Sequence, residues 1–385
     1  MNWDHPTAFW EYGPEEHAAI DRVIQSGQFT MGPEVKAFEE EFAAYHGMRH
    51  GIMVNSGSSA NLIAVATLFH KRDNPLKRGD VAVVPAIAWS TTYAPLVQYG
   101  LELQVIDVDD TWNANVHDRD NAAKICKAKL MIGCSVLGNP APLNYMKTLC
   151  GQAGTYMIED NCESIGASSA GKLCGTFGLM NTFSFFITHQ LSGIEGGMIL
   201  TDDDECAALC RVLRAHGWTR DVQKPDSFTH EYDFRAMGYN VRPVEMHAAV
   251  ARVQLNKLSA GMVARRENYY DFRNTASEAG LQLTFVEDGG TMNPFGIHFL
   301  CPPRDVAPIM ETRSRVVSAL RANSIDCRLP TGGSFRMHGY GKPWRDQPTP
   351  VADLIHRDGL FIGNAPWPIP EKIEKAIGVI KGALG

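Results

Sequence analysis

Short apolar runs alternate with longer amphipathic or polar segments in the first part of the chain. The runs at residues 81–85, 103–108, 130–132 and 156–159 are rich in branched side chains and are separated by helical or loop segments. This pattern favours an α/β fold with a mostly parallel central sheet and helices on both faces. Because ligands of such sheets bind at the carboxyl ends of the strands, we expect site residues directly after these runs.

Amphipathic stretches mark the expected helices. Residues 15–25 and 35–43 predict two helices near the start of the chain. A long helical stretch runs from about residue 254 to 270, and beyond it the pattern changes to strands interspersed with Pro- and Gly-rich loops. We therefore expect a large domain at residues 1–255 and a smaller C-terminal α+β domain at residues 256–385.

The composition is that of an ordinary globular protein. The 385 residues are 44% hydrophobic and carry a formal net charge of -7. This charge argues against general nucleic-acid binding, which usually needs a basic face, but leaves anionic small ligands possible. The first residues lack a basic region followed by an apolar one, and no apolar run approaches membrane-spanning length. We expect neither export nor membrane insertion.

The cysteines give no sign of a structural cross-link. They are nine in number and contain no C-x-x-C pair. An odd count without that spacing argues against a disulfide framework and against a zinc site. We expect no bound metal and a reducing, cytoplasmic location.

Residues 55–61 combine serines, a glycine and asparagines between an apolar segment and a helical run. Backbone N–H groups at such a helix N-terminus, together with hydroxyls such as that of Ser58 beside Gly57, suit a phosphate. The same residues also suit a helix N-cap without a ligand. The motif alone leaves both interpretations open.

Asp160 stands at the end of a probable buried strand, where an unpaired carboxylate is costly. It needs a cationic partner, which is either the protonated nitrogen of a pyridine ring or an arginine in a structural salt bridge. Trp89 lies just past another strand end. Its indole suits stacking on a flat ring, although core packing is the usual role of a lone tryptophan.

Together these segments resemble the sugar aminotransferase family (the DegT/DnrJ/EryC/StrS group) of fold-type-I pyridoxal-phosphate enzymes, from about residue 27 onward. The resemblance implies the aminotransferase fold and a cofactor held by its phosphate, by ring stacking and by a carboxylate at the pyridine nitrogen. The residues implied in these contacts are Gly57, Ser58, Trp89, Asp160 and Ser184. It further implies that Asn240 reaches the phosphate of a neighbouring subunit, so that the working unit is a homodimer with shared active sites.

Two residues depart from the usual family pattern. His189 stands where the family carries the lysine that anchors the cofactor aldehyde, and Glu163 stands where a glutamine usually contacts the cofactor phenol. Imidazole moves protons near neutral pH but cannot form that covalent anchor. A histidine in an aromatic-rich segment is also a common core residue, so the segment by itself leaves that role open.

Both departures, with the segments at 89–93, 176–180 and 214–220, resemble the branch of the family that removes the C3 hydroxyl of GDP-linked 4-keto-6-deoxy-mannose. The resemblance implies a lyase that uses pyridoxamine phosphate held without a covalent bond, with His189 as general base and then as the acid for the leaving hydroxyl. The implied products are a 3-deoxy-4-keto sugar and ammonia, and L-glutamate then restores the amine form of the cofactor. Such a step belongs to deoxysugar biosynthesis, for example that of colitose in O-antigen.

Three further residues are candidates for the sugar diphosphate. His216, Arg220 and Arg328 lie in segments that suit this contact, since arginine binds phosphate oxygens with two hydrogen bonds. A solvated surface position is the competing interpretation for the arginines. Which nucleotide and which sugar configuration are bound does not follow from local patterns, and GDP is favoured only by the resemblance.

Two other functions remain open at this point. One is an iron–sulfur 3-dehydrase of CDP-sugars, which needs four clustered cysteines, whereas Cys206 and Cys210 are the only close pair here. The other is a nucleotide-sugar-binding pseudoenzyme that lost its lysine. The retained Asp160 argues against it, because a silent protein has little need for an electron sink.

Overall fold

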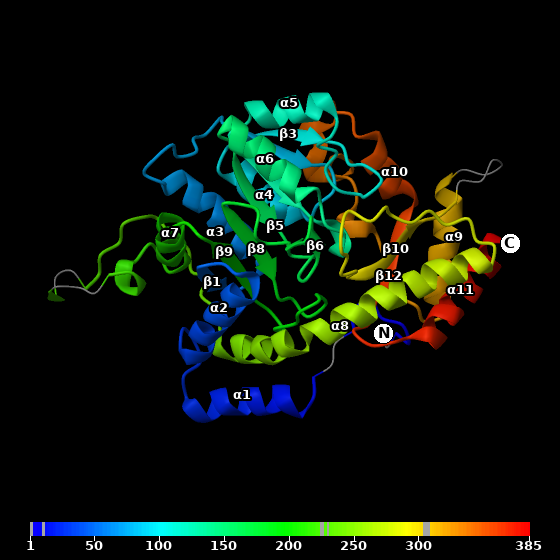
Figure 1. Ribbon diagram of the computed structural model, residues 1–385, viewed down its shortest axis with the longest axis horizontal. Helices are drawn as coiled ribbons and strands as arrows, with labels where there is room; N and C mark the ends of the chain where they lie inside the picture. The colour runs from blue at the N-terminus through cyan, green and yellow to red at the C-terminus, as the bar shows by residue number, and fades with distance from the viewer. Residues whose placement is uncertain (1–2, 10–11, 224–226, 229–230, 303–308) are drawn as a thin grey trace.

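A seven-stranded sheet forms the centre of the larger part of the protein (Figure 1). The computed structural model describes residues 3–9, 12–223, 227–228, 231–302 and 309–385. The sheet order is β1-β9-β8-β5-β4-β2-β3; β9 is antiparallel to both neighbours, and the other pairs are parallel. The predicted mostly parallel sheet is confirmed. Its strands are β1 (His50–Val54), β2 (Val81–Pro85), β3 (Glu102–Ile106), β4 (Leu130–Cys134), β5 (Tyr156–Asp160), β8 (Met180–Ser184) and β9 (Gly197–Thr201).

Helices cover both faces of this sheet. Successive strand residues point to opposite sides, so both faces carry apolar side chains that the helices bury. Val83 packs in one apolar cluster with Ile125 and Met146, whereas its neighbour Val84 packs in another with Ile63. Burial on both faces explains why these strands are apolar throughout. The helices that alternate with the strands are α3 (Gly57–His70), α4 (Ser90–Gln98), α5 (Arg119–Lys127), α6 (Leu143–Ala153) and α7 (Asp204–Arg214), and a short hairpin of β6 (Ser168–Ser169) and β7 (Lys172–Leu173) follows β5.

A second, smaller sheet lies near the C-terminus. It is antiparallel in the order β10-β12-β11; two helices of this part contact its strands, and a third packs against one of these helices. This arrangement agrees with the expected α+β character of the C-terminal part. Its elements are β10 (Gly296–Leu300), α9 (Ile309–Ala322), β11 (Cys327–Arg328), α10 (Pro350–Asp358), β12 (Gly359–Gly363) and α11 (Pro370–Leu384).

One long helix, α8 (Glu245–Glu278), packs against both parts of the molecule (Figure 1). It contacts α1 (Pro14–Ser26) and α2 (Pro33–His46), and also α11 and β10. The expected boundary between residues 255 and 256 falls inside this helix. The helix gives the two parts a shared spine, and the division into two domains stays a prediction.

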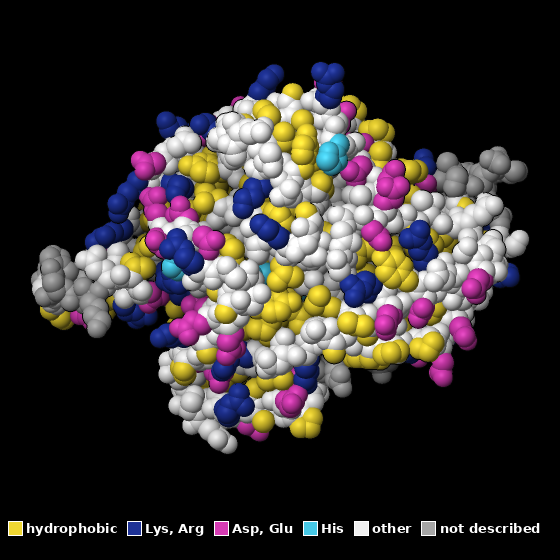
Figure 2. Space-filling model, in the orientation of Figure 1, with side chains coloured by type: hydrophobic (Ala, Val, Ile, Leu, Met, Phe, Trp, Pro, Cys, Tyr) yellow, Lys and Arg dark blue, Asp and Glu magenta, His cyan; other side chains and the backbone are white. Residues whose placement is uncertain are grey.

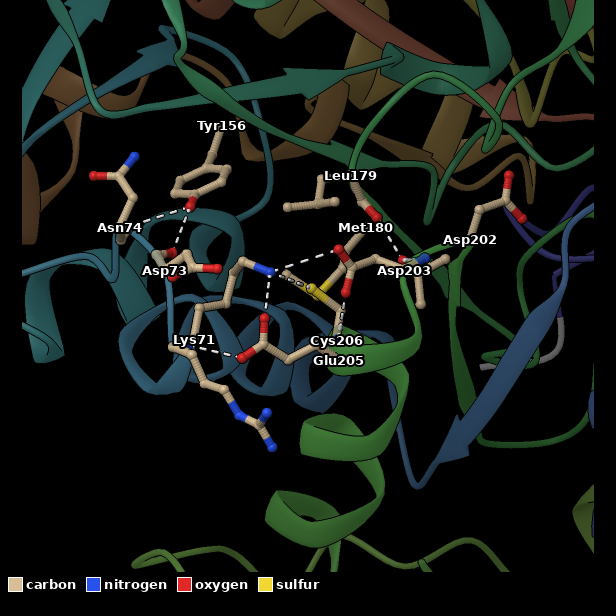
Figure 3. Close-up of polar contacts among 12 residues, drawn as sticks. Lys71, Asp73, Asn74, Tyr156, Leu179, Met180, Asp202, Asp203, Glu205 and Cys206 are labelled. Carbon is tan, nitrogen blue, oxygen red and sulfur yellow. Dashed lines mark hydrogen bonds and ion pairs between the residues drawn. The ribbon is translucent and has the colours of Figure 1, made fainter.

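A polar network joins the end of α3, the start of α7 and the start of β5 (Figure 3). The ammonium of Lys71 lies 3.0 Å from Glu205 Oε2 and 3.5 Å from Asp203 Oδ2. The hydroxyl of Tyr156 donates to the carbonyl oxygens of Asp73 and Asn74 at 3.2 and 3.1 Å. Because Tyr156 is the first residue of β5, this network lies at the opposite end of the strand from Asp160.

Surface charge is mixed on the face seen in Figure 2. Basic and acidic side chains are interspersed there, without a continuous basic patch. Within the described part of the chain, no helix combines the length and the apolar character needed to cross a membrane.

Candidate active site

A cavity of about 440 Å³ lies at the carboxyl ends of the central strands. The last residues of β5 and β8, Asp160 and Ser184, line it, together with the start of α3 and residues of the C-terminal part. Eight of the residues singled out from the sequence come together here. They are Gly57, Ser58, Trp89, Asp160, Glu163, Ser184, His189 and Arg328.

The start of α3 forms a cup that fits a phosphate. Ser56 is the N-cap and accepts a hydrogen bond from the backbone N–H of Ser59 at 3.1 Å. A Cβ atom at Gly57 would lie 2.5 Å from Ser184 Cβ and 2.7 Å from Cys162 Sγ, so only glycine fits. The hydroxyl of Ser58 lies 2.7 Å from that of Thr91. The N–H groups of the first turn, the serine hydroxyls and the dipole of a 14-residue helix together favour an anion here.

The carboxylate of Asp160 is buried and is held by neutral donors alone. It accepts hydrogen bonds from Asn61 Nδ2 at 2.8 Å, Thr92 Oγ1 at 2.8 Å and the backbone N–H of Cys162 at 3.1 Å. No lysine, arginine or histidine of the described residues forms an ion pair with it. The arginine salt bridge left open by the sequence is therefore wrong. A buried negative charge without a cation fits a ligand that brings one, such as a protonated pyridine.

Trp89 is the residue before α4, and its side chain is 55% exposed. The alternative of a core tryptophan is wrong for this reason. Its indole lines the cavity instead. It is available to stack on a flat ring.

The imidazole of His189 lines the cavity and makes few contacts. Its Nδ1 lies 3.4 Å from the carbonyl oxygen of Ser184, and Nε2 has no hydrogen-bond partner among the described residues. The rings of Phe186 and Phe295 meet it edge-on, with centroids 5.9 and 5.3 Å away. Burial lowers the pKa of His189 to about 4, so the ring is neutral at physiological pH. The generic core role left open by the sequence does not hold for a ring that faces a cavity.

Glu163 also lines the cavity and joins its two walls. Its Oε2 accepts hydrogen bonds from the backbone N–H of Leu137 and from the hydroxyl of Thr331, both at 2.9 Å. Oε1 accepts none from a described residue. Burial raises the pKa of Glu163 to about 7, against two hydrogen bonds that lower it. A carboxyl with this pKa is substantially protonated near neutral pH.

Three of the predicted residues do not line this cavity: Asn240, His216 and Arg220. The backbone of Asn240 pairs with that of Ala215, and His216 Nε2 lies 2.6 Å from Arg242 Nη1. The guanidinium of Arg220 lies 4.3 Å from the centre of the Trp218 ring. In this arrangement, neither His216 nor Arg220 reaches the cavity of its own chain, where a sugar diphosphate would bind.

Several lining residues escaped the sequence reasoning. Asn61 and Thr92 hold Asp160, and both lie in segments whose glycine, serine and tryptophan drew attention instead. Thr331 and Phe295 come from the C-terminal part, where no local motif marks them. Helical spacing gave a signal for Asn61, since it lies one turn after Gly57 on the same helix. The same spacing relates Thr92 to Trp89 at the start of α4, whereas no such signal existed for Thr331 and Phe295.

The fold and this pocket define an aminotransferase-type α/β protein: a mostly parallel sheet flanked by helices, with a phosphate cup and a buried carboxylate at the carboxyl ends of its strands. The family model "DegT/DnrJ/EryC1/StrS aminotransferase family" matches residues 11–380. The chain belongs to this family, as the sequence predicted.

Individual relatives extend over nearly the whole chain. A GDP-4-keto-6-deoxy-D-mannose 3-dehydratase of Yersinia pseudotuberculosis is 36% identical over 390 residues, covering 98% of each chain. The solved structure of the E. coli GDP-4-keto-6-deoxy-D-mannose-3-dehydratase with bound hydrated PLP is 34% identical, with a TM-score of 0.91 and coverage of 99% of this chain and 100% of that one. A structure of GDP-4-keto-6-deoxymannose-3-dehydratase with a trapped PLP-glutamate geminal diamine is 34% identical, with a TM-score of 0.89 and coverage of 98% and 100%.

Proposed function

We propose that this chain is a pyridoxal-phosphate-dependent 3-dehydratase that removes the C3 hydroxyl of a nucleotide-linked 4-keto-6-deoxy sugar. The observation that carries the proposal is a neutral imidazole, that of His189, facing a cavity built for this cofactor. Relatives at 34–36% identity that bear the dehydratase name support it. We propose GDP-4-keto-6-deoxy-mannose as the favoured substrate for the same reason.

The cavity suits the cofactor at three points. The cup of Ser56, Gly57 and Ser58 would hold its phosphate, the exposed indole of Trp89 would cover its ring, and the carboxylate of Asp160 would bind its pyridine nitrogen. When bound, the cofactor supplies an amine that condenses with the sugar ketone and a ring that accepts electrons. Ser184, at the end of β8, lies directly against Gly57 and would complete the cup.

His189 would move the protons of the reaction. Because its pKa lies near 4, the ring is neutral at neutral pH and keeps one N–H. A proton on Nδ1, which faces the carbonyl oxygen of Ser184 at 3.4 Å, would leave Nε2 free to accept a proton as general base. The protonated ring would then be the acid that delivers this proton to the C3 hydroxyl as it leaves. An imidazole does both without becoming covalently attached, which a lysine at this position would not.

Glu163 would act beside it as a hydrogen-bond donor. Its Oε2 is occupied by Leu137 and Thr331, so the proton it carries below a pKa of about 7 is available on Oε1. We propose that this group faces the cofactor phenol oxygen. A glutamate that is half-ionised near neutral pH makes that contact sensitive to pH in a way that the usual glutamine is not.

We further propose L-glutamate as the amino donor and a homodimer as the working unit. The glutamate adduct named in a related structure supports the donor. Exposed apolar side chains in the segment before Asn240 support the dimer, since Tyr232, Phe234 and Met237 are 64%, 55% and 94% exposed. In such a dimer Asn240 would reach the phosphate cup of the partner, and His216 and Arg220 the partner's sugar diphosphate.

Arg328 is the basic residue that its own chain brings to the cavity wall among the described residues. Its side chain is 59% exposed and lies 3.7 Å from Asp326, which leaves guanidinium N–H groups for a phosphate oxygen. We propose that it contacts the diphosphate of the sugar nucleotide.

We also propose a cytoplasmic location for this protein. All nine cysteines are free thiols, and reduced cysteines are typical of that compartment.

The test is a product assay with a panel of nucleotide-linked 4-keto sugars, pyridoxal phosphate and excess L-glutamate. We expect ammonia, 2-oxoglutarate and a sugar product that is lighter by its C3 oxygen, with the GDP-linked mannose derivative as the fastest substrate. An amino sugar that keeps its C3 oxygen, or no turnover with any substrate, would refute the proposal.

The iron–sulfur alternative lacks its ligands. Among the described residues, no three His, Cys, Asp or Glu side chains converge on a point where a metal could bind. Cys206 and Cys210 are buried in the packing of α7, where Cys210 Sγ lies 3.2 Å from Thr67 Oγ1. The pseudoenzyme alternative predicts no ammonia in the product assay, and the same experiment decides it.

A further inference from the structure

The residue after His189 ties three parts of the pocket together. Gln190 is 7% exposed, and its side-chain Nε2 donates hydrogen bonds to the carbonyl oxygens of Glu163 and, at 3.0 Å, of Asn293. Both partners are acceptors, so the NH₂ group of the amide has to face them. A carboxylate in the same place would face two carbonyl oxygens.

These contacts continue into a closed path. Leu137 donates its N–H to the Glu163 carboxylate at 2.9 Å, and its carbonyl accepts the N–H of Phe295 at 3.1 Å. The Phe295 ring in turn packs against His189, with centroids 5.3 Å apart. The path therefore runs from His189 through Gln190, Glu163, Leu137 and Phe295 back to His189.

The turn at Leu137 needs this support. Leu137 has a φ of 50°, in the left-handed region that a residue with a Cβ atom adopts only at a cost in free energy. Hydrogen bonds on both its N–H and its carbonyl hold it there. The turn would relax if the Glu163 segment moved, and Phe295 would move with it.

The imidazole of His189 has little of its own to fix it, since its only hydrogen-bond contact among the described residues is the 3.4 Å approach to Ser184. We propose that Gln190 is a positioning residue, which sets the place of His189 in the cavity and couples it to Glu163 through its two donated hydrogen bonds. The expected effect of Gln190 on the rate of dehydration rests on the proposed function. The expected effect on the position and the pKa of His189 does not depend on that function.

The test compares two glutamines that each bridge two backbone groups. In Gln190→Met the side chain keeps its length and loses only donated bonds, because Gln190 Oε1 has no partner among the described residues. The control is Gln347→Met: Gln347 donates to Leu103 O at 3.2 Å and accepts from Val105 N at 2.6 Å, on the edge strand β3 and outside the cavity lining. Both variants should lose comparable thermal stability.

The first readout is the titration of His189 in the cofactor-free protein, followed by NMR of ¹⁵N-labelled histidines and assigned with His189→Asn. In wild type and in Gln347→Met we expect a pKa near 4, and in Gln190→Met a rise toward the ordinary value of 6.5 because the ring gains access to water. The second readout is dehydration: kcat should fall by about ten- to a hundredfold in Gln190→Met, with KM nearly unchanged, since a displaced proton carrier affects chemistry more than binding.

Gln190→Asn, which keeps the amide on a shorter stem, should give intermediate values and replaces Gln190→Met if that variant does not fold. The inference is overturned if His189 titrates as in wild type in the Gln190 variant, or if Gln347→Met shifts it equally. Absence of dehydration by the wild-type protein would refute the proposed function alone, since the NMR comparison needs neither cofactor nor substrate.

Discussion

The two ionisable groups most central to the proposed chemistry are held in opposite ways. Asp160 accepts three hydrogen bonds from Asn61, Thr92 and Cys162, at 2.8, 2.8 and 3.1 Å. His189 has one contact of 3.4 Å and the edges of two phenylalanine rings. Both line the same cavity: Asp160 is the last residue of β5, and His189 lies five residues after the end of the neighbouring strand β8.

The difference follows from what each group has to do. A carboxylate that balances a fixed positive charge gains from many donors, because each favours its ionised form and holds it still. A proton carrier has to stay neutral between steps and keep one nitrogen free. Burial without a strong partner provides both for His189, and the fixed position comes from the backbone around it.

The largest effect on the rate of dehydration is expected at His189, the group with few contacts. We expect His189→Lys to lower dehydration by about 10²- to 10⁴-fold, because the acid–base function is lost and the amine attaches to the cofactor instead. Borohydride reduction followed by mass spectrometry should show the cofactor on the lysine variant and not on wild type. Unchanged dehydratase turnover in the variant would contradict the assignment.

A substitution at the strongly held group should act on binding. In Asp160→Asn we expect cofactor affinity to fall by about ten- to a hundredfold, since a charge-assisted hydrogen bond of about 1.5–3 kcal/mol is lost. Equilibrium dialysis with pyridoxamine phosphate measures this directly.

Glu159 provides the matched control, one position earlier on β5. Its carboxyl group is buried on the face of the sheet opposite to that of Asp160. It accepts hydrogen bonds from the backbone N–H of Gly175 and Phe177, at 2.6 and 3.0 Å. Glu159→Gln should therefore lower thermal stability while leaving cofactor affinity near that of wild type. Equal loss of affinity in both variants would mean that the cofactor does not sit on Asp160.

A change at Glu163 should alter the pH profile more than the maximal rate. As a donor, Glu163 works while protonated, so kcat/KM should fall as the pH rises through about 7. In Glu163→Gln the amide donates at every pH, so this alkaline limb should vanish. At pH 8 the variant should keep a fraction of its own maximal kcat/KM that is about tenfold larger than the fraction kept by wild type. The acid limb, set by His189 near pH 4, should stay in both. An alkaline limb that persists in the variant would show that Glu163 is structural.

The smallest effect is expected far from the cavity, in the network of Figure 3. Lys71→Met removes the ion pairs with Glu205 and Asp203, whose side chains are 29% and 31% exposed. The Lys71 side chain itself is only 9% exposed, but water still reaches both carboxylates after the exchange, so we expect a loss of about 1 kcal/mol in the free energy of unfolding. Calorimetry should detect it, while cofactor affinity and product remain those of wild type.

The sequence predicted the fold and most of the cavity floor because both depend on local patterns. Apolar runs gave strands β2, β3, β4 and β5, and local residue patterns pointed to Gly57, Ser58 and Asp160, whereas Ser184 came only from the family resemblance. These residues meet at one edge because the strands that carry them run in the same direction. Thr331 and Phe295 were missed because they reach the cavity from the C-terminal part, over separations that no local pattern encodes.

The electrostatic state of the site was equally out of reach. That Asp160 has only neutral partners depends on which side chains the fold brings against it, as do the opposite pKa shifts of His189 and Glu163. Asn240 shows a different limit, because its predicted role involves a second subunit. His216 and Arg220, predicted to contact the sugar diphosphate, lie outside the cavity of their own chain, so that in our proposal their contact is with the partner's ligand. These roles stay predictions.

The most direct test is a single turnover of wild-type protein with a stoichiometric amount of pyridoxamine phosphate and GDP-4-keto-6-deoxy-mannose, without glutamate, analysed by mass spectrometry of the sugar. If His189 returns its proton to the C3 hydroxyl, the sugar loses that oxygen as water and appears as the 3-deoxy-4-keto product. A 4-amino sugar that retains the C3 hydroxyl would show that the proton goes to C4 instead, and the account would fail.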